Sequence, residues 1–371
     1  MSEQSGAIAR PRTSTRDTGE ARAAVRAWLR TRVPDPGAEV LDLAVPSANG
    51  MSSETLLLTA RWTENGGPVE RRLVVRLAPR GDAVPVFPRY DLAAQFESMR
   101  LVRDHVPVPD VHWYEPDPGP LGSPFFVMAR QDGRVPPDIP PYVYGSWVTE
   151  LSPQARSRMQ DATVEVIAAL HRIPDAPSQF AFLDREAPDG RSTLRRHVDA
   201  TRAYADWATA EHPSPLVDRG FAWLDANWPR EEGPTVLSWG DSRVGNIMYT
   251  DGADVLPAAV LDWEMAALGV PELDLAWLVD LHRMFQTGAE RRGVPGLPDF
   301  LRWDDVTARY AELTGYRPRD EEFHRVYATL RMSVISLRTQ LRAVRFGEIA
   351  MPDDPDDLIR ARCDLEDLIT A

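Results

Sequence analysis

The sequence predicts an α+β protein of two lobes, a small β-rich lobe followed by a larger and mainly helical one. Alternating apolar and polar residues, typical of strands, dominate up to about residue 130, and helical spacing dominates beyond it. A proline-rich connection, GRVPPDIPPYVYG, lies between the two. We therefore expect a polar tail over residues 1–17, an N-terminal lobe over 18–130 and a C-terminal lobe over 131–371.

The N-terminal lobe is predicted to be a small sheet with one helix, preceded by the amphipathic helix ARAAVRAWLRTRV. The segments LLLTARW and VERRLVVRLA flank ENGG, and Asn-Gly is the strongest short signal for a hairpin turn. YDLAAQFESMRLVRDH has the spacing of a helix. VHWYE and PFFVMA predict two further strands.

Helices dominate the rest of the chain. Ser152 is expected to cap a helix whose first residue is Pro153, because serine accepts from the first free N–H groups and proline lacks one. The stretch 235–264 interrupts the helices with short strands and a loop. Further helices are predicted over 193–211, 215–227, 272–286, 303–314, 320–346 and 355–369.

Composition excludes several classes of function. The net charge of −14 disfavours binding to nucleic acids and anionic membranes, because both bind basic surfaces. All 42 basic residues are arginine, which excludes a standard Walker A loop and any lysine nucleophile. The chain has neither the G-x-S-x-G of α/β-hydrolases nor the G-x-G-x-x-G of dinucleotide-binding folds.

The compartment and the partners follow from similar observations. Cys363 is the only cysteine, and no Cys/His cluster has zinc-site spacing. The first residues lack the apolar core of a signal peptide, and no apolar run approaches the ~18 residues of a membrane span. We expect a cytoplasmic protein without a membrane partner, and the sequence does not indicate its oligomeric state.

Three polar residues stand at the ends of the short apolar segments in the interruption: Asp241, Asn246 five residues later, and Asp262. Carboxylate and amide oxygens suit Mg²⁺, which takes its remaining ligands from water and substrate phosphates. Phosphoryl transfer also uses a carboxylate to orient or deprotonate the attacking hydroxyl. The alternative is that all three are ordinary turn and cap residues, which Asp and Asn favour.

The flanking residues connect this pattern to a known family. SWGDSRVGNIMY and AAVLDWEMAALGVPELDLAWLV closely resemble the signature of the aminoglycoside phosphotransferase and choline kinase superfamily, small-molecule relatives of protein kinases. The resemblance is greatest to the kinase-like domain fused to some acyl-CoA dehydrogenases. It implies a bilobal protein-kinase-like fold, Asp241 as the catalytic base, Asn246 and Asp262 as Mg²⁺ ligands, and Asp274 as an acceptor that braces the catalytic loop.

The resemblance also implies a nucleotide site in the N-terminal lobe. The Ser-rich turn would cover the phosphates, Arg76 would replace the usual phosphate-binding lysine, and Glu97 would be its ion-pair partner. The alternatives are a plain hairpin and a surface ion pair. The nucleotide-binding candidates are Gly50, Ser52, Ser53, Arg76 and Glu97, with the backbone of Met128 and Ala129 contacting adenine.

Two residues depart from the family pattern. Trp239 replaces a histidine that mainly braces the loop. We therefore expect the replacement to affect the geometry of the loop more than the chemistry of the site. Arg76 stays cationic but is planar and bulkier than lysine, so we expect an altered nucleotide affinity.

The expected reaction is transfer of the γ-phosphoryl group of Mg-ATP to a hydroxyl of a small molecule, either an aminoglycoside or a hydroxylated acyl metabolite. Four arginines, spaced by 7, 4 and 3, share one face of the last long helix: Arg331, Arg338, Arg342 and Arg345. If that face lines the acceptor site, the acceptor is anionic, and otherwise these arginines pair with surface carboxylates.

The alternative function is a nucleotide-binding pseudokinase with a regulatory role. A protein kinase is disfavoured because no A-P-E-like anchor follows Asp262.

Overall fold

A computed structural model describes the chain except residues 1–16, 47–52, 80–83, 185–189, 253 and 371. The described chain forms two compact units that interleave along the sequence. The first unit comprises residues up to 92, 112–130 and 337–358, and the second comprises 93–111, 131–336 and 359 onwards. The lobe boundaries drawn from the sequence remain predictions.

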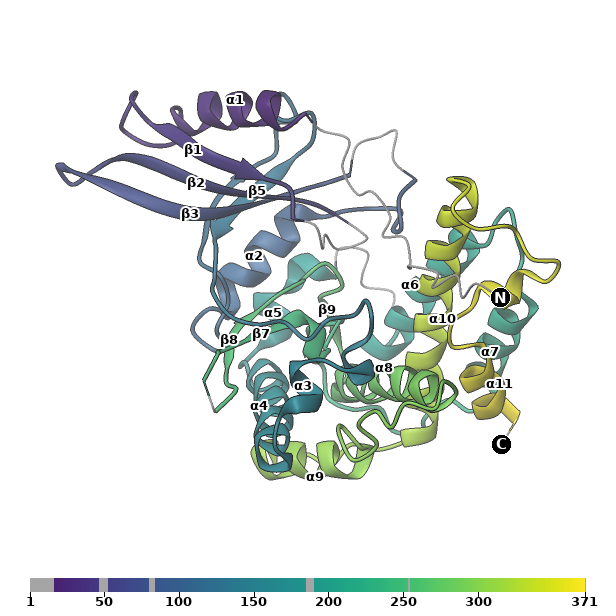
Figure 1. Ribbon diagram of the computed structural model, residues 1–371. Helices are drawn as coiled ribbons and strands as arrows, with labels where there is room; N and C mark the ends of the chain where they lie inside the picture. The colour runs from purple at the N-terminus through teal and green to yellow at the C-terminus, as the bar shows by residue number, and fades with distance from the viewer. Residues whose placement is uncertain (1–16, 47–52, 80–83, 185–189, 253, 371) are drawn as a thin grey trace, which may run out of the picture. The chain divides into compact units, whose positions relative to one another are not determined.

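The first unit is built on a five-stranded sheet of order β1-β2-β3-β5-β4 (Figure 1). Strand β2 pairs antiparallel with β1 and with β3, and β3 pairs antiparallel with β5. Asn65 and Gly66 close the β2–β3 hairpin with φ angles of 52° and 79°, so the turn predicted at ENGG is confirmed. The strands are β1 (Glu39–Ala44), β2 (Glu54–Glu64), β3 (Gly67–Leu77), β4 (Val111–Glu115) and β5 (Phe125–Ala129).

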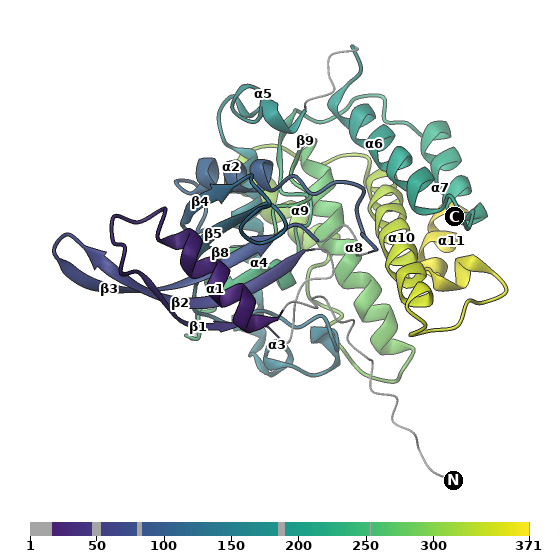
Figure 2. The same cartoon turned by 90° about the horizontal axis from the view of Figure 1, so that it is seen from above.

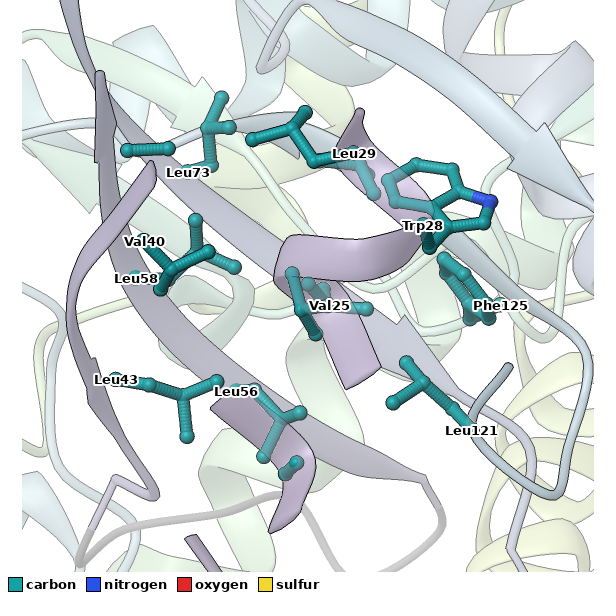
Figure 3. Packing of buried hydrophobic residues seen from close by; sticks show 14 of the residues in the cluster. Val25, Trp28, Leu29, Val40, Leu43, Leu56, Leu58, Leu73, Leu121 and Phe125 are labelled. Carbon is teal, nitrogen blue, oxygen red and sulfur yellow. The ribbon is translucent and has the colours of Figure 1, made fainter. Parts of the chain in front are cut away.

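Helix α1 (Thr18–Leu29) packs its apolar side chains onto one face of this sheet. Val25, Trp28 and Leu29 are buried with residues that alternate along the strands, among them Leu56 and Phe125 (Figure 3). The Trp28 indole N–H donates to Glu115 Oε2 at 2.8 Å, which satisfies the polar atom of a buried ring. The helix and the sheet therefore share one core.

The second unit is mainly helical, which confirms the α+β fold class. Ser152 accepts from Ala155 N at 3.1 Å, so the cap predicted for α4 is also confirmed. Helices α8 and α10 lie side by side, with Ala276 and Trp277 packed against Ala328 and Met332 (Figure 2). The helices are α2 (Leu92–Val102), α3 (Trp147–Glu150), α4 (Pro153–His171), α5 (Ala176–Gln179), α6 (Thr193–Ala208), α7 (Pro215–Ala226), α8 (Pro271–Glu290), α9 (Trp303–Thr314), α10 (Glu321–Arg345) and α11 (Arg362–Thr370).

The helix predicted over 355–369 is wrong in one respect. A short 3-10 helix covers Pro355–Leu358, and α11 begins only at Arg362. The backbone N–H of Arg360 donates to the Ser336 hydroxyl at 3.2 Å instead of a carbonyl one turn earlier. The competing hydroxyl acceptor accounts for the break.

Two short pairs of strands interrupt the helices of the second unit. Strand β6 (Val236–Ser238) pairs with β9 (Ala267–Gly269), and β7 (Ile247–Tyr249) pairs with β8 (Pro257–Val260), both antiparallel. The strands expected in 235–264 are therefore present, and the loops between them carry the candidate catalytic residues.

In the described part of the chain, none of the helices combines the length and the apolar character needed to cross a bilayer.

Replacing Leu56 with Ala should lower the free energy of unfolding by about 2–5 kcal/mol, because the side chain is fully buried and a cavity remains. Leu57 is the matched control, because it points to the other face of β2 and is only partly buried. Urea unfolding of both variants measures the difference. An equal loss in Leu57→Ala would contradict the assignment of the core face.

Candidate active site

Gly240 sets the backbone direction immediately before Asp241. It follows β6 with a φ of 87°, in the left-handed region that favours glycine. A Cβ at this position would lie 2.0 Å from the carbonyl oxygen of Met265. Only glycine fits, so the turn that presents Asp241 is built into the sequence.

The carboxylate of Asp274, in the first turn of α8, holds the segment that leads to Asp241. Its Oδ1 accepts from Ser238 Oγ at 2.9 Å and from Gly240 N at 2.8 Å. Its Oδ2 accepts from Trp239 N at 2.8 Å and is 3.0 Å from His171 Nε2. Burial disfavours the charged form, but His171 and the two backbone N–H groups outweigh it and lower the pKa of Asp274.

His171 is a packed residue at the end of α4. Its Nε2 donates to the Asp274 carboxylate at 3.0 Å, and its Nδ1 shares a hydrogen bond of 2.9 Å with the Tyr310 hydroxyl. The ring is buried. His171 thus fixes the orientation of Asp274 from α4.

Trp239, which stands where the family has histidine, also braces the loop. Its indole N–H donates to the carbonyls of Leu261 at 3.0 Å and Asp262 at 3.2 Å, and its ring is fully buried. Trp239 therefore ties the Asp241 loop to the strand end at Asp262.

Three donors hold the carboxylate of Asp241. Trp277 Nε1 donates to Oδ1 at 2.7 Å, and Asn246 Nδ2 donates to Oδ2 at 2.6 Å. Arg243 Nε also donates to Oδ2, at 3.1 Å. The carboxylate is 15% exposed, so it is positioned on both oxygens and still reachable.

Sequence reasoning missed Arg243, Trp277 and Asp138. Arg243 bridges two carboxylates, since its Nη1 donates to Asp138 Oδ2 at 2.5 Å while Nε contacts Asp241. Burial opposes its charge, but both carboxylates outweigh that effect and raise its pKa. Two signals were available, a basic residue inside the Asp241–Asn246 loop and an indole one turn after Asp274 on the same helix. No sequence signal marks Asp138.

Asn246 and Asp262 come from neighbouring strand ends. Leu261 N donates to Asn246 O at 2.8 Å, which brings the residue before Asp262 against Asn246. Asp262 lies beyond the end of β8, and its φ of 58° is in the left-handed region. Among the described residues, no three His, Cys, Asp or Glu side chains gather as a metal cluster.

The nucleotide-binding candidates fall into separate places. Gly50 and Ser52 lie outside the described residues, whereas Ser53 is buried and its hydroxyl has no hydrogen-bond partner within the described chain. Arg76 Nη1 donates to Thr55 Oγ1 at 3.4 Å.

The remaining candidates have partners of their own. Met128 and Ala129 end β5, opposite Val74 and Leu73 of β3. Glu97 accepts from Arg100 on its own helix, and this hydrogen bond lowers the pKa of Glu97. Its pairing with Arg76 remains a prediction.

The four arginines of the stripe do not share one environment, and Arg345 is the exposed one. Arg331 is buried, with Nη2 3.3 Å from the carbonyl oxygen of Gly240. Arg338 donates through Nε and Nη2 to the carbonyl of Pro85, and the Arg342 guanidinium lies 5.6 Å from the Phe346 ring. The stripe is therefore not a uniform anionic-ligand surface, and Arg331 is the member that contacts the catalytic loop.

A small pocket of about 10 Å³, close to the volume of one water site, adjoins this loop inside the second unit. His282 Nε2 donates to the Leu297 carbonyl, so Nδ1 accepts from Tyr142 OH at 2.6 Å. Burial lowers the pKa of His282 to about 4, which keeps the ring neutral at pH 7. The lining residues are Asp138, Tyr142, Arg243, Val244, Gly245, Leu278, Leu281, His282, Phe285 and Leu301.

A large part of the sequence matches a known protein family. Residues 48–321 match the model of the phosphotransferase enzyme family. The chain is 30% identical over 210 residues to mouse acyl-CoA dehydrogenase family member 10, covering 56% of this chain and 18% of that protein. It is 30% identical over 204 residues to human acyl-CoA dehydrogenase family member 11, covering 55% of this chain and 24% of the relative. The match therefore spans less than a third of either relative.

Solved structures show the same fold. A candidate aminoglycoside phosphotransferase from Ralstonia eutropha has a TM-score of 0.64 and 22% identity, with 94% of this chain and 96% of that chain covered. Aminoglycoside phosphotransferase APH(4)-Ia, in a ternary complex with ADP and hygromycin B, has a TM-score of 0.53 and 16% identity, with 94% and 98% covered. At these identities the likeness concerns the fold, and it confirms the predicted bilobal kinase-like class.

Replacing Asp274 with Ala should lower the free energy of unfolding by at least about 3 kcal/mol at pH 7, because several buried donors lose their acceptor. A carboxyl group whose pKa is lowered by folding stabilises above its unfolded pKa and loses that effect as pH falls through the folded value. The difference between wild type and variant should therefore shrink below the ordinary carboxyl value of 3.8. Denaturant unfolding at several pH values measures it.

The matched control is Asp225→Ala, since Asp225 is half exposed and pairs with Arg195 and Arg202 at the surface. It should change the free energy of unfolding by less than about 1 kcal/mol. A pH-independent effect of Asp274→Ala would show that the charge of Asp274 is not what holds the loop.

Proposed function

Because the chain belongs to the phosphotransferase enzyme family, we propose that it transfers the γ-phosphoryl group of Mg-ATP to a hydroxyl of a small molecule. The observation that carries the proposal is the placement of Asp241. Its carboxylate is fixed by three donors and still partly exposed, at the end of a turn that only glycine permits. A carboxylate held in this way suits the orientation of an attacking hydroxyl.

In the proposed reaction Asp241 receives the proton of the acceptor hydroxyl. Its Oδ1 accepts one hydrogen bond, from Trp277, and so retains capacity for the substrate, whereas Oδ2 already accepts two. The hydroxyl oxygen forms a bond to the γ-phosphorus, and the bond from that phosphorus to the β–γ bridging oxygen breaks. ADP leaves with the electrons of that bond.

Asn246 and Asp262 are proposed to hold Mg²⁺, and the donor set fits this ion. The Nδ2 of Asn246 donates to Asp241, so its amide oxygen is turned away from that carboxylate and, among the described residues, meets no protein donor. Amide and carboxylate oxygens are ligands that Mg²⁺ accepts. When bound, Mg²⁺ would neutralise negative charge on the phosphate groups.

The nucleotide is proposed to contact Gly50, Ser52, Ser53, Arg76 and the backbone of Met128 and Ala129, with Glu97 supporting Arg76. The Arg76 guanidinium supplies a fixed positive charge where lysine is usual, and it can pair bidentately with phosphate. Two solved proteins with this fold are complexes with ADP and GDP, which supports nucleotide use.

Two acceptor classes follow from the relatives. APH(4)-Ia is described with hygromycin B and another relative with kanamycin, which makes an aminoglycoside one candidate. The relatives of higher identity are acyl-CoA dehydrogenase family members, which makes a hydroxylated acyl metabolite the other. The higher identity favours the acyl class.

The test is ADP release from Mg-ATP against two acceptor pools, one of aminoglycosides and amino alcohols and one of hydroxy acids and their CoA esters. Turnover is expected with one pool, and Asp241→Asn should lower kcat by about 10²–10⁴-fold, the usual contribution of a general base. Asn246→Ala should raise the Mg²⁺ concentration needed for half-maximal rate. Asp225→Asn is the matched control, because that carboxylate lies at the surface of α7.

Turnover with the cationic pool would favour the aminoglycoside class, and turnover with the anionic pool the acyl class. ATP binding without turnover on either pool, unchanged in Asp241→Asn, would overturn the proposal in favour of a regulatory pseudokinase.

A further inference from the structure

Arg331 is a buried cation on α10, and within the described parts of the chain it forms no ion pair with Asp or Glu. The residue is 5% exposed. Asp274 and Asp241 favour its charge electrostatically without pairing with it. Burial disfavours its charge and lowers its pKa. Since a buried charge without an ion pair costs free energy, packing alone does not explain why an arginine stands here.

The contacts of Arg331 lead to the loop that presents Asp241. Its guanidinium lies 4.6 Å from the centre of the Trp277 ring and 5.8 Å from that of Tyr327. Its Nη2 donates to the Gly240 carbonyl at 3.3 Å. Arg331 thus touches an aromatic residue of α8 and the residue that precedes Asp241 in the chain.

Both contacts continue to the Asp241 carboxylate. The Trp277 ring that faces the guanidinium also donates its indole N–H to Asp241 Oδ1 at 2.7 Å. A cation over an indole is attracted by its π-face, which fixes the ring, and it draws electron density away from the N–H. Arg331 therefore reaches Asp241 through Trp277 on one side and through the Gly240 backbone on the other.

We infer that Arg331 is a positioning residue, whose unpaired charge holds the indole of Trp277 and the Gly240 carbonyl so that Asp241 stays aligned with the acceptor hydroxyl. The inference rests on the proposed role of Asp241 as the base. It assigns Arg331 to alignment within the second unit, not to binding of nucleotide. Loss of the charge should therefore lower kcat and leave the KM for ATP unchanged.

The test compares Arg331→Met, which keeps length and apolar volume, with Arg331→Lys, which keeps the charge. The first readout is the indole N–H resonance of Trp277, assigned by its disappearance in Trp277→Phe. In Arg331→Met it should shift and exchange with solvent at least ten times faster, whereas Arg331→Lys should stay near wild type. This readout needs no turnover, so an inactive wild-type protein would contradict the proposed function and still leave this test decisive.

The second readout is kinetic, with the acceptor pool that supports turnover. Arg331→Met should lower kcat at least tenfold with the KM for ATP within twofold, because a small displacement of a catalytic group is costly to the rate. Arg331→Lys should lose less than fivefold. The unfolding temperature of Arg331→Met should not fall, because an unpaired buried charge is removed.

Arg325→Met is the matched control on the same helix. Arg325 is ion-paired with Asp280 and Glu321, so its loss should lower the unfolding temperature and leave kcat within twofold. An unchanged Trp277 resonance in Arg331→Met would overturn the inference. The inference would also be overturned if Arg331→Lys lost as much kcat as Arg331→Met. The same holds if Arg331→Met lowered the unfolding temperature as much as Arg325→Met does.

Discussion

The conformation of the catalytic loop depends on one buried carboxylate, that of Asp274. Strand β6 ends at Ser238, so the next two backbone N–H groups have left the sheet and need another acceptor. Asp274 accepts both of them, together with the Ser238 hydroxyl, and is itself oriented by His171. The left-handed turn at Gly240 and the direction of Asp241 follow from this arrangement.

Two indole groups supply hydrogen bonds that hold the catalytic loop. Trp239 ties the loop to the end of β8, and Trp277 holds Asp241. An indole N–H is a donor only, and it neither gains nor loses a proton over the physiological pH range. The donors of these two indole hydrogen bonds therefore do not depend on pH over that range.

Sequence signals predicted the features that depend on neighbouring residues in the chain. The Asn65-Gly66 turn, the Ser152 cap and the strands around Asp241 follow from residue types at fixed spacing, as does the fold class. Contacts between distant segments left no such signal. Arg243 meets Asp138 from 105 residues away, and the break before α11 depends on a hydroxyl in α10. Side-chain pairing of this kind is decided by tertiary packing, which periodicity does not report.

The interleaving of the two units has a consequence for synthesis on the ribosome. The first unit includes residues 337–358, where Arg338 binds the Pro85 carbonyl, so it is incomplete until that segment emerges. At roughly 5–20 residues per second, the segment that follows residue 130 delays completion by about 10–40 s. During that interval the sheet lacks the contact that Arg338 makes with the Pro85 carbonyl. Fragments cut at residue 130 for expression would lack the same segment permanently.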